Sequence, residues 1–128
     1  MVTPGDIGRV RMGGRRILVV EDDALIAMEM AERLVELGYN ALEPARSVEA
    51  AEKLIASQRP DAALLDANLA GVSSVALGAK LAAMGVPVAF CTGYDAIKNL
   101  PPELAKAPIL TKPISDDALT STLKALLP

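Results

Sequence analysis

The pattern that decides the fold is RPDAALLDANLAG, residues 59–71. Within it a short apolar run, Ala62 to Leu65, follows a proline and ends at Asp66. A run of this length is typical of a strand that is buried on both faces of a parallel sheet. Ligands of open α/β sheets bind beyond the carboxyl ends of the strands, so Asp66 lies where a side chain can do chemistry. The pattern is equally consistent with an aspartate that starts a turn or caps a helix.

The composition excludes several classes of protein. The chain has 128 residues, enough for one domain with its own core. Only 2% of the residues are aromatic and the net charge is −3, which argues against a nucleic-acid-binding surface. One cysteine and no histidine exclude a disulfide framework and a His/Cys zinc site. No apolar run approaches the ~20 residues of a membrane span and no signal peptide is present, so we expect a cytoplasmic protein.

Short apolar runs alternate with helical patterns along most of the chain. Residues 1–14 are rich in glycine and have no apolar period, which predicts a flexible leader before a single domain at 15–128. The pattern predicts strands at 17–20, 40–45, 62–65, 86–90 and 109–110, and helices at 25–35, 48–55, 74–84 and 116–127. The segment 94–107 contains two adjacent prolines and has room for a turn or two of helix only. The alternation predicts an α/β fold: a three-layer, doubly wound, five-stranded parallel sheet with a shortened or irregular fourth helix.

Polar side chains follow four of the predicted strands. Glu21, Asp22 and Asp23 follow the first, and Asp66, Thr92 and Lys112 follow three later ones. Parallel strands bring these residues to one edge of the sheet. Like charges ~4 Å apart repel by about 4 kcal/mol at an effective dielectric constant of 20, so clustered carboxylates need a cation. Oxygen ligands without histidine or cysteine favour Mg²⁺.

The same residues suit phosphoryl transfer to a carboxylate. Such a reaction needs a carboxylate nucleophile, a divalent metal and donors for the phosphoryl oxygens. Asp66 is the natural nucleophile, because Glu21 and Asp22 form a pair suited to holding the metal. Lys112 is either a salt-bridge partner of the acids or a binder of the phosphoryl group. A threonine hydroxyl at a strand end, such as that of Thr92, is more commonly bonded to nearby backbone.

Four motifs in order resemble the receiver domain of two-component response regulators. They are ILVVEDD at 17–23, LLDANL at 64–69, FCTGY at 90–94 and TKP at 111–113, and the resemblance extends from about residue 15 to residue 127. It implies the strand order 2-1-3-4-5 and a signalling protein, not an enzyme. It also implies that Asp66 accepts a phosphoryl group from a sensor histidine kinase or a histidine phosphotransfer protein. Asp22, Asp66 and the backbone carbonyl of Asn68 would bind Mg²⁺, and Glu21 would act mainly through water.

The resemblance assigns roles to the last two motifs as well. Lys112 would bind the phosphoryl group, the bond from Lys112 to Pro113 would be cis, and Thr92 would turn its hydroxyl toward the phosphoryl group. Receivers usually carry an aromatic residue where this sequence has Ile109. The FCTGY motif is instead similar to that of a stand-alone subclass, in which Tyr94 is the candidate switch residue. A half-exposed loop tyrosine without a switching role is the alternative.

No output domain follows Leu127 in the sequence, so we expect a stand-alone receiver, a monomer or weak dimer, that acts through an unknown output protein or relays phosphate. One alternative is a pseudo-receiver, which binds partners without being phosphorylated. Another is an aspartyl phosphohydrolase of the haloacid dehalogenase type. In such enzymes a second acid protonates the leaving group, and Asn68 stands at that position here.

Overall fold

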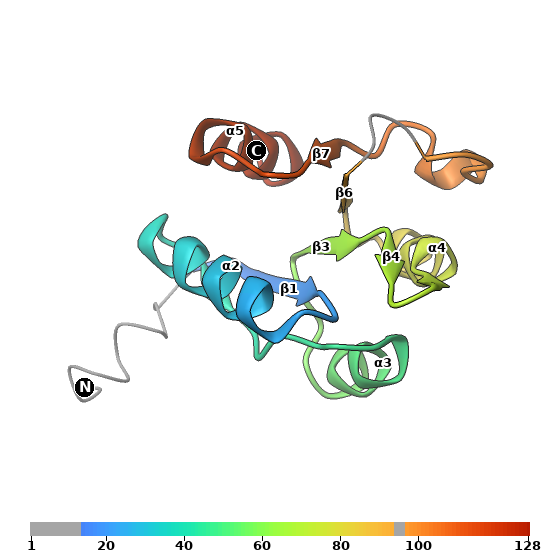
Figure 1. Ribbon diagram of the computed structural model, residues 1–128, viewed down its shortest axis with the longest axis horizontal. Helices are drawn as coiled ribbons and strands as arrows, with labels where there is room; N and C mark the ends of the chain where they lie inside the picture. The colour runs from blue at the N-terminus through green and yellow to red at the C-terminus, as the bar shows by residue number, and fades with distance from the viewer. Residues whose placement is uncertain (1–13, 94–96) are drawn as a thin grey trace.

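One five-stranded parallel sheet forms the centre of the protein (Figure 1). The computed structural model describes residues 14–93 and 97–128. The strands are β1 (Arg16–Val20), β2 (Asn40–Ala41), β3 (Ala62–Asp66), β6 (Val88–Thr92) and β7 (Ile109–Thr111). They lie in the order β2-β1-β3-β6-β7, which is 2-1-3-4-5 along the chain. The predicted fold class and the implied strand order are therefore confirmed.

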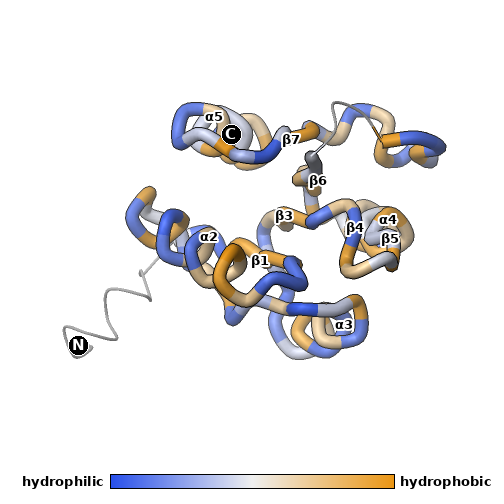
Figure 2. Tube along the Cα trace, viewed as in Figure 1, coloured by the Kyte–Doolittle hydropathy of each residue, from blue (hydrophilic) through white to orange (hydrophobic). Residues whose placement is uncertain are grey.

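The sheet is covered on both faces by helices. Helices α2 (Ala24–Glu36) and α5 (Asp116–Leu126) lie on one face, and α3 (Val48–Ser57) and α4 (Val75–Ala83) lie on the other (Figure 1). The strand residues alternate between two hydrophobic clusters: Leu18 and Leu65 pack toward α3 and α4, whereas Val19 and Leu64 pack toward α2 and α5. In Figure 2, hydrophobic residues run along β1, and hydrophilic and hydrophobic residues alternate along α2.

The central strand β3 is buried along its whole length, as its apolar sequence predicts. It pairs with β1 on one side and with β6 on the other, and Leu65 lies opposite both Val20 and Phe90. Asp66 is the last residue of β3 and lies opposite Cys91. The sheet therefore delivers Asp66 to its carboxyl edge.

A small hairpin after β3 was not predicted. Strands β4 (Asn68–Leu69) and β5 (Val72–Ser73) pair antiparallel. Ala70 and Gly71 both have positive φ values, 52° and 93°, as a two-residue hairpin turn of type I′ requires. The side chain of Asn68 stabilises this turn, since its Oδ1 accepts the N–H of Gly71 at 2.6 Å. Alanine at the first turn position, where glycine or asparagine is usual, hides the hairpin in the sequence.

The fourth helix is shortened, as predicted. Between residues 97 and 107 the regular structure is a single 3-10 turn, η1 (Pro102–Leu104), whose Leu104 is buried against α4. The predicted boundaries of two strands were wrong. The second strand ends at Ala41 and not at residue 45, with a separate bridge between Val20 and Ala45. Strand β6, predicted at 86–90, begins and ends two residues further along the chain. The predicted leader lies outside the described residues except for residue 14. No helix among the described residues is long and apolar enough to cross a bilayer.

Candidate functional site

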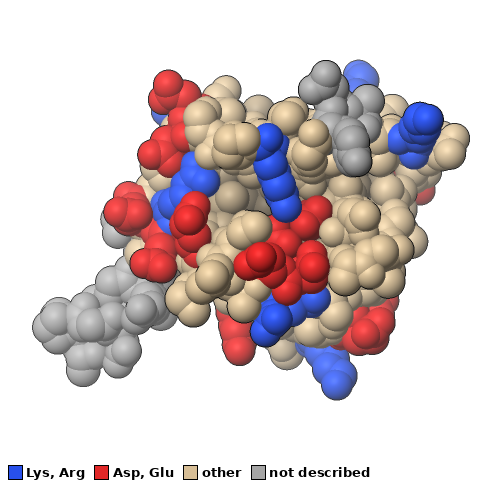
Figure 3. All heavy atoms as spheres, viewed as in Figure 1, with Lys and Arg blue, Asp and Glu red and all other residues tan. Residues whose placement is uncertain are grey.

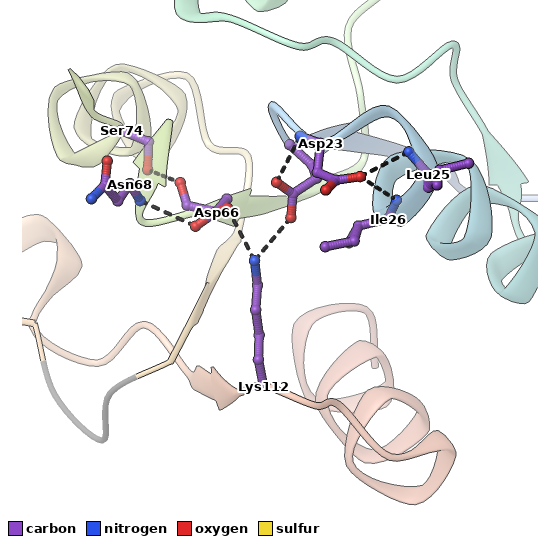
Figure 4. A network of polar contacts seen from close by, with 8 residues as sticks. Asp23, Leu25, Ile26, Asp66, Asn68, Ser74 and Lys112 are labelled. Atoms are coloured by element: carbon purple, nitrogen blue, oxygen red, sulfur yellow. Dashed lines mark hydrogen bonds and ion pairs between the residues drawn. The ribbon is translucent and has the colours of Figure 1, made fainter. Parts of the chain in front are cut away.

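Asp66 is held at the carboxyl end of β3 by bonds to both of its side-chain oxygens (Figure 4). Its Oδ1 accepts the backbone N–H of Asn68 at 3.1 Å. Its Oδ2 lies 3.0 Å from the Nζ of Lys112, and the side chain retains 11% exposure. The carboxylate is therefore oriented and partly desolvated, yet it still reaches the surface.

Glu21 follows β1 directly and is almost fully buried, with 5% of its surface exposed. Its Oε1 accepts from Lys112 Nζ at 2.9 Å, and its Oε2 accepts the N–H of Asp23 at 3.2 Å. Burial is the largest influence on the pKa of Glu21 and raises it. Lys112 and the Asp23 N–H act in the opposite direction, and the neighbouring carboxylate of Asp66 raises the pKa further.

Lys112 bridges Glu21 and Asp66 from the carboxyl end of β7, an outer strand of the sheet. It follows β7, and its backbone N–H donates to the carbonyl of Thr92 at 2.8 Å. The bond from Lys112 to Pro113 is cis, the geometry that the resemblance implies. Partial burial acts to lower the pKa of Lys112, but hydrogen bonds to Glu21 and Asp66 outweigh this and raise it. The ammonium group is therefore charged at neutral pH.

The acids form a pocket suited to a metal. Ligand oxygens of Glu21, Asp22 and Asp66 all lie within 4.8 Å of one another. An adjoining cavity of about 30 Å³ is lined by Glu21, Asp66 and Lys112 together with apolar residues. Figure 3 shows acidic side chains grouped at the centre of this face, with a basic side chain reaching them. A set of oxygen ligands alone fits Mg²⁺, and Asp22 is the most accessible of the three acids.

The remaining predicted residues differ in how near they lie to this pocket. Thr92 is the buried last residue of β6, and Ile109 begins β7 opposite Phe90. The side chain of Asn68 is exposed and engaged in the hairpin turn, while its backbone lies beside Asp66. Tyr94 lies outside the described residues.

Two residues near the pocket have roles that the sequence analysis did not assign. The Oδ1 of Asp23 accepts the N–H groups of Leu25 and Ile26, so Asp23 caps α2. An aspartate directly before a helical apolar pattern is a usual capping signal and was available in the sequence. Ser74 is buried, and its hydroxyl donates to the carbonyl of Asp66 at 2.6 Å. Nothing local in the sequence indicates that bond, because it joins two different elements.

Comparison with known proteins agrees with this geometry. The profile of the response regulator receiver domain matches residues 17–124. The chain is 33% identical over 112 residues to the positive alginate biosynthesis regulatory protein of Pseudomonas aeruginosa, covering 84% of this chain and 45% of that protein. It is 44% identical over 82 residues to the phyllosphere-induced regulator PhyR of Methylorubrum extorquens, covering 61% of this chain and 30% of that protein.

A solved structure is similar over nearly the whole chain. The receiver domain of PhyR from Erythrobacter litoralis superimposes with a TM-score of 0.76 at 26% identity, covering 91% of this chain and 92% of that one. The chain belongs to the response regulator receiver domain family. It is a signalling module of two-component signal transduction and not an enzyme, and a receiver works with a cognate kinase. The chain spans half or less of the length of the curated relatives named above.

Proposed function

We propose that Asp66 is the phosphoacceptor of this receiver. The observation that carries the proposal is the arrangement of one carboxylate with an ammonium group 3.0 Å from its Oδ2 and two further acids within 4.8 Å. An oxygen of Asp66 attacks the phosphorus of a phosphohistidine on a sensor kinase or phosphotransfer protein. The P–O bond forms as the P–N bond breaks, and the leaving imidazole nitrogen takes a proton from water. Water later hydrolyses the acyl phosphate.

The surrounding residues divide the work of stabilising the transferred group. Bound Mg²⁺, held by Glu21, Asp22 and Asp66 with the Asn68 carbonyl, would offset the negative charge of the phosphoryl oxygens. Lys112 moves from its bridge between the acids to a phosphoryl oxygen, where it acts as a point charge. The exposed 30% of its side chain leaves room for this turn.

Phosphorylation changes the conformation of residues next to the site. Thr92, one strand away from Asp66, supplies a hydroxyl to the phosphoryl group, and Tyr94 and Ile109 are the switch residues that respond. The segment 94–107 carries little regular structure in its described part, which suits a region that changes conformation with charge. The output is altered binding to a partner protein or onward relay of phosphate, by a monomer or weak dimer whose receiver domain is residues 15–128.

Mass spectrometry of the intact protein tests the phosphoacceptor. After incubation with acetyl phosphate and Mg²⁺, or with a phosphorylated phosphotransfer protein, we expect a mass gain of one phosphoryl group. Asp66→Asn should abolish the gain. Asp61→Asn is the matched control, because Asp61 also borders β3 but lies at its other end, where its Oδ2 accepts the N–H of Arg16 at 2.7 Å. A wild-type protein that gains no mass from either donor would be a pseudo-receiver.

A further inference from the structure

The helix that follows the phosphoacceptor begins differently from the other three α-helices of the described residues. Asp23, Ser47 and Ser115 each accept a backbone N–H from the first turn of the helix that they begin. Ser74 stands at the same position of α4, but its side chain makes no such bond. Its hydroxyl instead donates to the carbonyl of Asp66 at 2.6 Å (Figure 4).

The bond to Asp66 takes the place of a helix cap. A serine at this position normally satisfies a free N–H of the first turn, which stabilises the helix. In α4 the N–H of Val75 is bonded by the hydroxyl of Ser73 at 3.2 Å, which leaves Ser74 free to point toward β3. Ser74 has 0% exposure, so its hydroxyl is shielded from water, and the distance of 2.6 Å is at the short end for a hydroxyl donor.

The backbone around this bond is tied on several sides. The N–H of Ser74 donates to the carbonyl of Ala67 at 3.1 Å, and the N–H of Ala67 donates to that of Cys91 at 2.9 Å. The peptide groups that follow Asp66 are thus fastened both to α4 and to β6. The carboxylate itself accepts the N–H of Asn68, so its direction depends on where that backbone lies.

We propose that Ser74 is a positioning residue for phosphoryl transfer. Its hydroxyl fixes the peptide between Asp66 and Ala67, and this holds the Asp66 carboxylate in line with Lys112 and the metal-binding acids. The inference rests on the proposed role of Asp66 as phosphoacceptor. Reacting groups need placement to within ~0.5 Å, so a bond that fixes their backbone affects the rate without touching the phosphoryl group.

Ser74→Ala tests this role, with Ser47→Ala as the matched control. Both remove one serine hydroxyl at the start of a helix, but Ser47 only caps α3. We expect phosphorylation of Ser74→Ala by acetyl phosphate at saturating Mg²⁺ to be slower by about tenfold or more, as is usual when a supporting hydrogen bond is lost. Ser47→Ala should lower the melting temperature and keep the rate within about twofold of wild type. Ser74→Thr, which keeps a hydroxyl, should be phosphorylated faster than Ser74→Ala.

A titration with Mg²⁺ alone, followed by amide chemical shifts, separates this inference from the proposed function. We expect weaker Mg²⁺ binding in Ser74→Ala than in Ser47→Ala, because the misdirected carboxylate is also a ligand. A folded Ser74→Ala with wild-type phosphorylation rate and Mg²⁺ affinity would overturn the positioning role. If Ser74→Ala does not fold, Ser74→Cys, similar in size but a weak donor, takes its place with the same expectations. Failure of the wild type to accept phosphate would instead overturn the role of Asp66.

Discussion

Lys112→Met removes the ammonium group from the acidic pocket while keeping a side chain of similar length. In the wild type the Nζ of Lys112 lies 2.9 Å from Glu21 and 3.0 Å from Asp66. The variant leaves both carboxylates in place with Asp22 close by. We therefore expect it to be less stable than the wild type at neutral pH without Mg²⁺.

The expected loss of stability depends on the balance between ion-pair attraction and the cost of desolvating the charges. At an effective dielectric constant of 20, each of the two ion pairs contributes an attraction of about 5–6 kcal/mol, most of which is offset by desolvation. Breaking a fully buried pair typically costs about 3–5 kcal/mol. The side chain of Lys112 is 30% exposed, so water screens part of the remaining repulsion. We expect the free energy of unfolding to fall by about 1–3 kcal/mol.

The loss should depend on pH through Glu21. The pKa of Glu21 in the folded protein is raised above 4.5, its ordinary value. The stability that protonated Glu21 contributes is therefore fully present below pH 4.5 and is lost as the pH rises through the folded pKa. Lys112 is the strongest influence that lowers this pKa, so the pKa of Glu21 rises further in Lys112→Met. The fall in the variant's stability with rising pH therefore continues to higher pH. The gap in stability between the two proteins should therefore narrow as the solution is acidified toward pH 4.5.

Urea unfolding followed by far-UV circular dichroism measures these effects, at several values between about pH 5 and 8, with and without Mg²⁺. Added Mg²⁺ should stabilise the variant more than the wild type, because it replaces the missing positive charge. Lys80→Met is the matched control, since Lys80 pairs with Glu52 at 3.1 Å on the surface and should cost less than about 1 kcal/mol. If Lys112→Met without Mg²⁺ matched the wild type in stability and pH dependence, the account of the pocket as a repulsive cluster would be wrong.

Two further substitutions and one measurement of thiol reactivity test the structure around the site. Gly78→Ala should lower the free energy of unfolding, measured in urea, by about 1–3 kcal/mol, because the new methyl group would lie 2.8 Å from the buried ring of Phe90. This effect should exceed the gain from the better helix propensity of alanine, and a stabilised variant would contradict it. The thiol of Cys91, whose pKa burial raises to about 12, should react far more slowly with iodoacetamide in the folded protein than in urea, and equal rates would refute it. Ala70→Gly should raise the free energy of unfolding by about 0.5–1 kcal/mol by relieving a φ of 52°, and any loss would count against the turn geometry.

The sequence predicted the sheet and the pocket because both depend on patterns within short segments. The run from Ala62 to Leu65 is apolar throughout, as is typical of a strand buried on both faces, and the polar residue after it marks the strand end. Once the strands are parallel, their ends share one edge, and the meeting of Glu21, Asp66 and Lys112 follows from topology. Side-chain distances were not needed for that inference.

The sequence did not predict contacts in which a residue departs from its usual local use. Ser74 precedes a helix, as capping serines do, and only the structure shows its hydroxyl turned toward Asp66. Ala70 adopts a positive φ that alanine rarely accepts, so the sequence at this position did not predict the hairpin turn before Ser74. For Ser74 a hydrogen bond to another element outweighs the local preference, and for Ala70 the pairing and hydrogen bond of the hairpin do so.

The charges of the pocket connect its stability with its chemistry. Glu21, Asp22 and Asp66 carry three negative charges when ionised, and Lys112 returns one positive charge, which leaves two negative charges. The raised pKa of Glu21 shows that the lysine alone does not offset burial and repulsion. A divalent cation would neutralise the remainder, and it would also release Lys112 from its bridge between the acids. Because an incoming phosphoryl group needs that same ammonium group, metal binding and readiness for phosphoryl transfer are expected to rise together.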